Sequence, residues 1–204
     1  ATAWKYGISC MITFGNDCMP PKDEFWKPLQ LGEQHFDWGY HGGRKHSQHQ
    51  RPNQMGYHLL DEPEPAARHY AWVREIIETY KNDERIGFWD LYNEPGNAQR
   101  EEVTLPHLVK FYEIAREIDS IQPVTFAVWR MHGEHALCAA AQFVLENPDI
   151  VSYHNNGTYD ENIAILRRHQ HTGRPNHHTE RLPRMPHNTV DTIHHRAHLD
   201  TDSS

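Results

Sequence analysis

Segments with strand-like and helix-like patterns alternate along most of this chain of 204 residues. Short runs rich in apolar and β-branched residues predict strands at 4–14, 86–92, 123–129, 149–154 and, in a polar form, 174–180. Apolar residues spaced by three and four positions predict helices at 63–83, 105–120, 134–149 and 159–173. Such alternation is typical of an α/β fold with a parallel sheet and crossover helices. A closed barrel and an open doubly wound sheet both fit the pattern.

The charge and hydropathy of the chain exclude several classes of protein. The formal net charge of −8 argues against a general surface for nucleic acids or anionic membranes. No apolar run approaches the roughly 18 residues of a membrane span, and no signal peptide is visible before Trp4. No helix opens with the glycine-rich motif of nucleotide-binding folds. We expect no nucleic-acid partner and no membrane, while the compartment and the oligomeric state stay open.

The chain carries 18 histidines and three cysteines. The histidines spread over the whole sequence, so scattered loop histidines are the simpler interpretation and a metal site is the other. Cys10, Cys18 and Cys138 match no zinc-binding spacing and predict buried or free thiols. We therefore assign no metal ligand among the candidate site residues.

Polar side chains with catalytic potential follow several of the predicted strands. Asn93 and Glu94 end the second strand, Trp129 the third, His154 the fourth and Glu180 the fifth. In parallel α/β folds the carboxyl ends of the strands gather at one edge, where active sites form. Two carboxylates at that edge suit glycosidic bond cleavage, in which one carboxyl group protonates the leaving oxygen and the other attacks the anomeric carbon. Asn93 is then placed to bond the sugar 2-hydroxyl.

The segment "FWDLYNEPGN" at 88–97 resembles the fourth-strand motif of clan A glycoside hydrolases, the cellulase-like (β/α)8 barrels that include glycoside hydrolase family 5. The resemblance implies that Glu94 is the acid/base and Asn93 its partner. In "NHHTERLPR" it implies that Glu180 is the nucleophile, and in "VSYHNNG" that His154 lines the same site.

Compared with that family, the chain contains about five βα units, which correspond to strands three to seven of the eight-stranded barrel. We therefore expect residues 1–190 to form an incomplete TIM barrel with a long substrate loop at 15–62. Residues 191–204 are expected to be a polar tail, disordered or non-native.

The long loop contains several aromatic residues, among them Trp26, Trp38 and Tyr40. Flat aromatic rings suit the apolar C–H face of a sugar, so one interpretation makes these residues substrate-stacking platforms. The other interpretation is a small satellite core that holds the loop down. Trp129, at the end of the third predicted strand, is also assigned to substrate binding.

The combined expectation is a retaining β-glycosidase that hydrolyses a β-linked polysaccharide or oligosaccharide. It would use a double displacement by two glutamates and no cofactor. Two alternatives stay open. The family often has a tyrosine at the position of Asn156 and an aromatic residue at that of Arg181. These departures, together with the missing barrel strands, also fit a degenerate barrel that binds carbohydrate without cleaving it. The histidine-rich loops also fit a metal-dependent hydrolase, although the sequence has no H-E-x-x-H motif.

Overall fold

The computed structural model describes residues 2–18, 58–97, 100–128, 139–155 and 158–180, and all structural statements concern these residues. The strands are β1 (Cys10–Thr13), β2 (Ile86–Asn93), β3 (Val124–Val128), β4 (Val151–His154) and β5 (Asn176–Glu180). The α-helices are α1 (Pro63–Tyr80), α2 (Glu101–Ile118), α3 (Ala139–Glu146) and α4 (Tyr159–His169). Short 3₁₀ turns are η1 (Ala3–Tyr6), η3 (Leu59–Asp61) and η5 (Gln170–Thr172).

The strands form a five-stranded sheet whose spatial order, β1-β2-β3-β4-β5, follows the order along the chain. Every neighbouring pair is parallel, and an α-helix connects each strand to the next. The predicted α/β class with alternating strands and helices is therefore confirmed. The assignment of these units to strands three to seven of a larger barrel stays a prediction.

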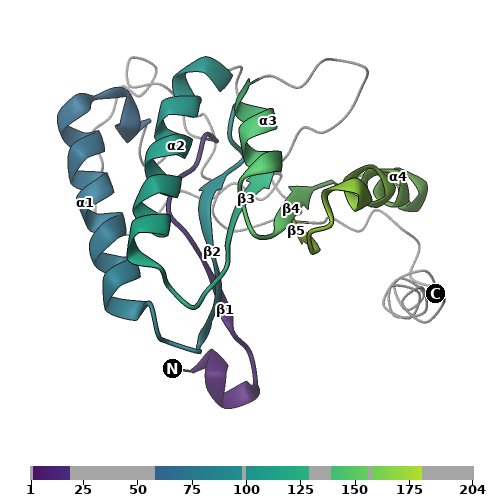
Figure 1. Cartoon of the computed structure of the whole chain (residues 1–204), viewed down its shortest axis with the longest axis horizontal. Helices are drawn as coiled ribbons and strands as arrows, with labels where there is room; N and C mark the ends of the chain where they lie inside the picture. The colour runs from purple at the N-terminus through teal and green to yellow at the C-terminus, as the bar shows by residue number, and fades with distance from the viewer. Residues whose placement is uncertain (1, 19–57, 98–99, 129–138, 156–157, 181–204) are drawn as a thin grey trace, which may run out of the picture.

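The sheet is curled into a half-barrel. Phe88 on β2 and His177 on β5 contact each other edge to face, with ring centroids 5.3 Å apart. Two strands, β3 and β4, lie between them, and a flat sheet would separate such residues by roughly 14 Å at about 4.8 Å per strand. Their contact therefore requires the strands to bend around a concave face, and the strand directions turn progressively from β1 to β5 in Figure 1.

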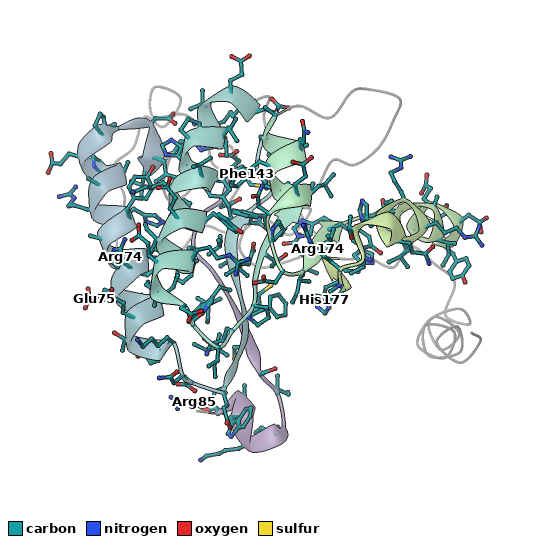
Figure 2. All side chains as sticks on the ribbon, in the orientation of Figure 1. Arg74, Glu75, Arg85, Phe143, Arg174 and His177 are labelled. Carbon is teal, nitrogen blue, oxygen red and sulfur yellow. The ribbon has the colours of Figure 1, made fainter. Side chains whose placement is uncertain are left out.

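The helices pack on the opposite, convex face, where Figure 1 shows α1, α2 and α3 side by side. Phe143 of α3 meets the rings of Tyr112 on α2 and Phe126 on β3, at centroid distances of 5.8 and 5.9 Å (Figure 2). Full burial of a side chain such as Phe126 stabilises the fold by roughly 1.5–3 kcal/mol. The largest fully buried side chains include Trp89, Phe111, Phe126, Ile77, Leu91 and Leu108. This core fixes the strands whose ends carry the candidate site.

Two polar side chains near the starts of predicted helices do not cap those helices. Thr104 directly precedes the helix predicted at 105–120, but it lies inside α2 and its hydroxyl donates to the buried carboxylate of Asp17. Asp61 fits a cap for α1, but that helix has no side-chain cap hydrogen bond and Asp61 pairs with Arg100 instead. In both cases a distant partner competes successfully with the local backbone for the polar side chain.

The predicted boundaries of one strand and one helix have different outcomes. The strand expected at 4–14 is shorter, because Ala3–Tyr6 form η1 and β1 begins only at Cys10. Gly173 ends the helical segment after α4 as expected, in a left-handed conformation with φ of 64°. Among the described helices, none combines the length and apolar character needed to cross a bilayer.

Several predicted segments lie outside the described residues. They are the tail at 191–204, most of the loop at 15–62, and the start of the helix expected at 134–149. The boundary of the barrel at residue 190 therefore stays a prediction.

Candidate active site

Glu94 follows an irregularity in the register between β2 and β3. The three steps from Asp90 to Asn93 in β2 lie opposite the two steps from Thr125 to Ala127 in β3. β2 therefore carries one extra residue just before Glu94. An extra residue turns the side chains that follow it to the other face of a sheet.

Glu180 follows a second irregularity, between β4 and β5. Tyr153 pairs with His178, whereas the next residue, His154, pairs with Glu180. Thr179 is thus the extra residue, and the shift turns Glu180 to the face that carries His154. Irregularities of this kind are common at barrel rims and beside active sites, where they re-aim a side chain.

The backbone of Glu94 is left-handed, with φ of 48°. Residues other than glycine seldom adopt this conformation, and those that do often lie at functional sites. The amide of Glu94 donates to the carbonyl of Ala127 at 2.7 Å, and its own carbonyl accepts from the amide of Asn97 at 3.1 Å. These bonds fix the turn that carries the carboxylate.

A buried carboxylate, Asp17, supports the same turn. Asp17 is 0% exposed and accepts hydrogen bonds from the amide of Gly96 and the hydroxyl of Tyr92, both at 2.7 Å. The hydroxyl of Thr104 on α2 is its third donor. Burial raises the pKa of Asp17, and the hydrogen bonds oppose that effect. Asp17 thus ties the chain after β1 to the turn after β2 and to α2.

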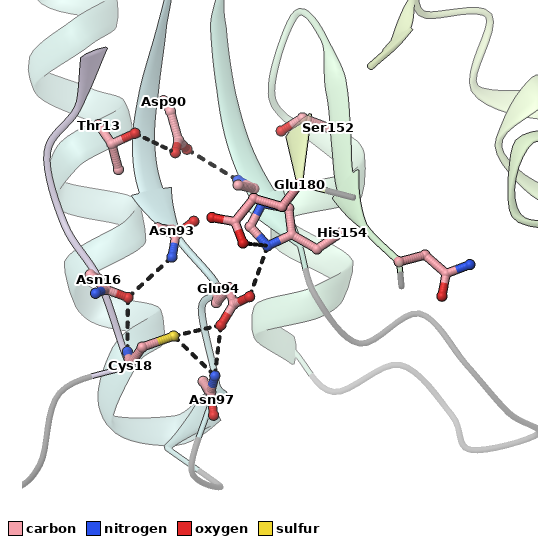
Figure 3. Close-up of polar contacts among 12 residues, drawn as sticks. Thr13, Asn16, Cys18, Asp90, Asn93, Glu94, Asn97, Ser152, His154 and Glu180 are labelled. Carbon is pink, nitrogen blue, oxygen red and sulfur yellow. Dashed lines mark hydrogen bonds and ion pairs between the residues drawn. The ribbon is translucent and has the colours of Figure 1, made fainter. Parts of the chain in front are cut away.

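The two oxygens of the Glu94 carboxylate have different partners (Figure 3). Oε1 lies 2.8 Å from Nδ1 of His154. Oε2 accepts from Nδ2 of Asn97 at 2.7 Å and from the thiol of Cys18. Burial opposes ionisation of Glu94, but the bonds from His154, Cys18 and Asn97 outweigh it and lower its pKa to about 2. Glu94 is therefore a carboxylate in this arrangement.

Cys18 and Asn97 are site residues that the sequence analysis missed. Cys18 is a free, buried thiol, as expected, and burial together with the nearby charge of Glu94 raises its pKa. It stays protonated and therefore acts as a donor. Nδ2 of Asn97 also contacts the sulfur, at 3.1 Å. Asn97 lies inside the motif quoted above, and Cys18 follows the end of the strand predicted at 4–14 by four positions. These are the signals that could have identified them.

Glu180 completes a cluster of three side chains. Its Oε2 lies 3.7 Å from Nδ1 of His154, and one potential ligand atom from each of Glu94, His154 and Glu180 lies within 4.8 Å of the other two. The side chains of His154 and Glu94 are 5% and 16% exposed, whereas that of Glu180 is 53% exposed. The cluster therefore has a buried floor and an open side. It offers two carboxylates to a sugar, or three ligand atoms to a cation.

Asn93 lies next to this cluster but contacts a different residue. Its Nδ2 donates to Oδ1 of Asn16 at 3.2 Å, and the same oxygen accepts from the amide of Cys18 at 2.8 Å. The role of Asn93 at a sugar 2-hydroxyl stays a prediction.

The aromatic residues assigned to substrate binding, Trp26, Trp38, Tyr40 and Trp129, lie outside the described residues. Their role also stays a prediction.

Comparison with known proteins leaves the family open. No family model and no curated protein matches the chain. A solved structure with partial similarity is the family 2 β-galacturonidase from Eisenbergiella tayi bound to galacturonate, with 20% identity and a TM-score of 0.44 over 60% of this chain. The chain spans 22% of the length of that protein. Similarity at this level decides neither family nor activity, so the resemblance to clan A and to family 5 stays a prediction.

Proposed function

We propose that this chain is part of a retaining β-glycosidase of the clan A, family 5 type, which hydrolyses a β-linked polysaccharide or oligosaccharide. The observation that carries the proposal is the spacing of the carboxylates, because an oxygen of Glu94 and an oxygen of Glu180 lie within 4.8 Å. Retaining glycosidases hold their two carboxyl groups about 5–5.5 Å apart, whereas inverting ones need about 6.5–9.5 Å to admit a water. The spacing favours retention.

The two glutamates have different surroundings, which suit different roles. Glu180 is half exposed on the open side of the cluster, so a sugar can reach it, and its attack on the anomeric carbon forms a glycosyl-enzyme. Glu94, held on the buried side, donates a proton to the leaving oxygen and later takes one from the attacking water.

Protonation of Glu94 requires a rearrangement when the sugar binds. Three donors hold it as a carboxylate, the form that activates water in the second step, whereas the first step needs the acid form. Nδ1 of His154 lies near both carboxylates, in the space that the reacting sugar would enter. We expect the sugar to break the bond between His154 and Glu94, which raises the pKa of Glu94.

The remaining contacts are those that the family resemblance implies, and the reaction uses no cofactor. Asn93 leaves Asn16 to bond the 2-hydroxyl of the sugar. Aromatic rings of the long loop stack on neighbouring sugar units.

Glutamine substitutions test the two roles together. We expect Glu94→Gln and Glu180→Gln each to lower kcat/KM on aryl β-glycosides by several orders of magnitude, because each removes an ionisable group at nearly constant volume. Glu113→Gln makes the same change at an exposed ion pair on α2 and should leave kcat/KM unchanged. Full activity in both site variants overturns the proposal.

Azide separates the two roles. In Glu180→Ala, azide can occupy the place of the nucleophile and give a glycosyl azide of inverted configuration. In Glu94→Ala, azide can attack the glycosyl-enzyme and give the retained product. The opposite pattern would exchange the two assignments. Saturable binding of an oligosaccharide without turnover by the whole protein would favour a carbohydrate-binding barrel instead.

A further inference from the structure

We propose that Glu94, His154 and Glu180 form a binding site for a divalent transition-metal ion, with Zn²⁺ the preferred ion, and that the bound ion inhibits sugar cleavage. The binding site rests on the geometry of the cluster alone. Only the inhibition rests on the glycosidase function proposed above.

The donor set is one imidazole nitrogen and two carboxylate oxygens, which together suit Zn²⁺. A tetrahedral zinc with bonds of about 2.0–2.2 Å holds its ligand atoms roughly 3.3 Å apart. Nδ1 of His154 lies 2.8 Å from Oε1 of Glu94 and 3.7 Å from Oε2 of Glu180. The widest separation in the cluster is no more than 4.8 Å, so a small rotation of the exposed Glu180 side chain brings all three atoms to bonding distance.

The two inner ligands are already oriented. Oε2 of Glu94 is held by Cys18 and Asn97, which leaves Oε1 directed at His154. Ligating carboxylates are commonly fixed in this way through their other oxygen. His154 and Glu180 lie on the ends of adjacent strands, β4 and β5, which hold them more rigidly than a loop would.

Glu180 provides the open side of the site. Its exposure leaves room for water at the fourth position of the ion. The ring proton of His154 moves to Nε2 when Nδ1 binds the ion. Nε2 has no hydrogen-bond partner among the described residues, and a metal-bound histidine that lacks such a partner typically binds about 10- to 100-fold more weakly. We therefore expect reversible binding in the micromolar range.

An ion in this position occupies both catalytic carboxylates. Glu180 can no longer attack the anomeric carbon, and Glu94 can no longer exchange a proton with the leaving oxygen. Since the ion and the sugar compete for one space, zinc should raise KM and leave kcat unchanged.

The binding test uses the whole protein freed of metal by a chelator and then dialysed. Zinc affinity is measured by competition with a chromophoric zinc indicator, and Co²⁺ absorption reports the ligand geometry. The chain has 18 histidines, any of which could contribute background zinc binding, so the informative quantity is the difference between variants. Glu180→Gln and His154→Gln should lose one binding equivalent or weaken it at least tenfold, while Glu113→Gln should match the wild type.

Glu180 is half exposed, so its substitution leaves folding intact and keeps the test decisive if His154→Gln misfolds. Equal zinc and cobalt binding by wild type and Glu180→Gln overturns the site. If Glu180→Gln loses zinc binding but zinc does not change the turnover of the wild type, the inhibition is overturned.

The two proposals fail in different ways. If the wild type cleaves no β-glycoside but binds zinc more tightly than Glu180→Gln does, the metal site stands and the glycosidase proposal is refuted. Zinc that activates hydrolysis leaves the metal site standing, overturns the inhibition and the metal-free mechanism, and favours a metal-dependent hydrolase.

Discussion

The rings of Phe88 and His177 meet on the concave face of the half-barrel, although two strands separate β2 from β5. The same bend brings Glu94, just after β2, within 4.8 Å of Glu180 at the end of β5. A flat sheet would hold these two carboxylates too far apart for one sugar. The curvature of the sheet is therefore a condition of the proposed chemistry.

Replacing Phe88 by alanine tests this connection. The variant loses an edge-to-face contact, which is worth roughly 0.5–1.5 kcal/mol beyond the burial of the ring. Urea unfolding should therefore show a loss of at least that size, because the buried apolar area of the ring is lost as well. We also expect kcat/KM to fall because β5, and with it Glu180, is less firmly placed. Val103→Ala, at a 49% exposed position on α2, is the control and should change little. A Phe88→Ala variant with unchanged stability and turnover would show that the curvature is set elsewhere.

Asp17 offers a prediction about the turn that carries Glu94. Asp17→Ala leaves the amide of Gly96 and the hydroxyls of Tyr92 and Thr104 buried without their acceptor. We expect a loss of roughly 3–5 kcal/mol in unfolding free energy, since unsatisfied buried donors cost about 1–3 kcal/mol each and water or relaxation recovers part. Asp160→Asn, at an exposed site on α4, should stay within about 0.5 kcal/mol of the wild type. A small effect for Asp17→Ala would mean that the turn is held by its own backbone bonds.

Alanine substitutions at two glycines separate the stability cost of a left-handed backbone from that of a steric clash. Gly96 and Gly173 have φ of 80° and 64°, so alanine costs about 1 kcal/mol at either. At Gly96 an added Cβ would also lie 2.7 Å from Cγ of Glu101, whereas at Gly173 nothing lies within 4 Å. We therefore expect Gly96→Ala to cost about 1 kcal/mol more than Gly173→Ala in thermal or urea unfolding. Adding Glu101→Ala should remove that excess, and an excess that persists would exclude the side chain of Glu101 as its cause.

The sequence contains enough information to predict the layout of this fold. The apolar run at 86–92 becomes β2, and the alternating pattern predicts the parallel strands. Their spatial order, which follows the chain, is expected only from the resemblance to a barrel. Glu94, His154 and Glu180 each end or follow a predicted strand. This alone places them at the carboxyl edge of the sheet, because parallel strands end on the same side. These features depend on local pattern and on topology, which a single sequence records.

The close geometry of the site depends on features that no local pattern records. The extra residue of β5, Thr179, determines which face Glu180 takes, and composition does not reveal such a shift. Cys18 becomes a donor only because the turn after β2 brings Glu94 to it. Thr104 fits a helix cap equally well until Asp17 is known to lie beside it. In each case a contact between distant segments determines the outcome.

The burial of Asp90 leads us to expect that the free energy of unfolding depends on pH. Burial raises its pKa to about 6, although the hydroxyl of Thr13 and the amide of Ala127 donate to its carboxylate. An aspartate in the unfolded chain has an ordinary pKa of 3.8, so the folded chain holds this proton more tightly than the unfolded chain. The stabilisation is complete below about pH 4 and is lost as pH rises through about 6, which amounts to roughly 3 kcal/mol.

The measurement is the unfolding free energy of wild type and Asp90→Asn between pH 4 and 7.5. Asparagine has no such proton to lose, so the free energy of the wild type should fall relative to the variant by roughly 2.5 kcal/mol across this range. The charge of His154 also lowers the pKa of Asp90, and His154 is present in both proteins, so its own titration largely cancels in the difference. Asp160→Asn should follow the wild-type curve. Parallel curves for wild type and Asp90→Asn would show that Asp90 stays ionised in the folded chain, and that the concave face beneath the two glutamates is wetter than its burial implies.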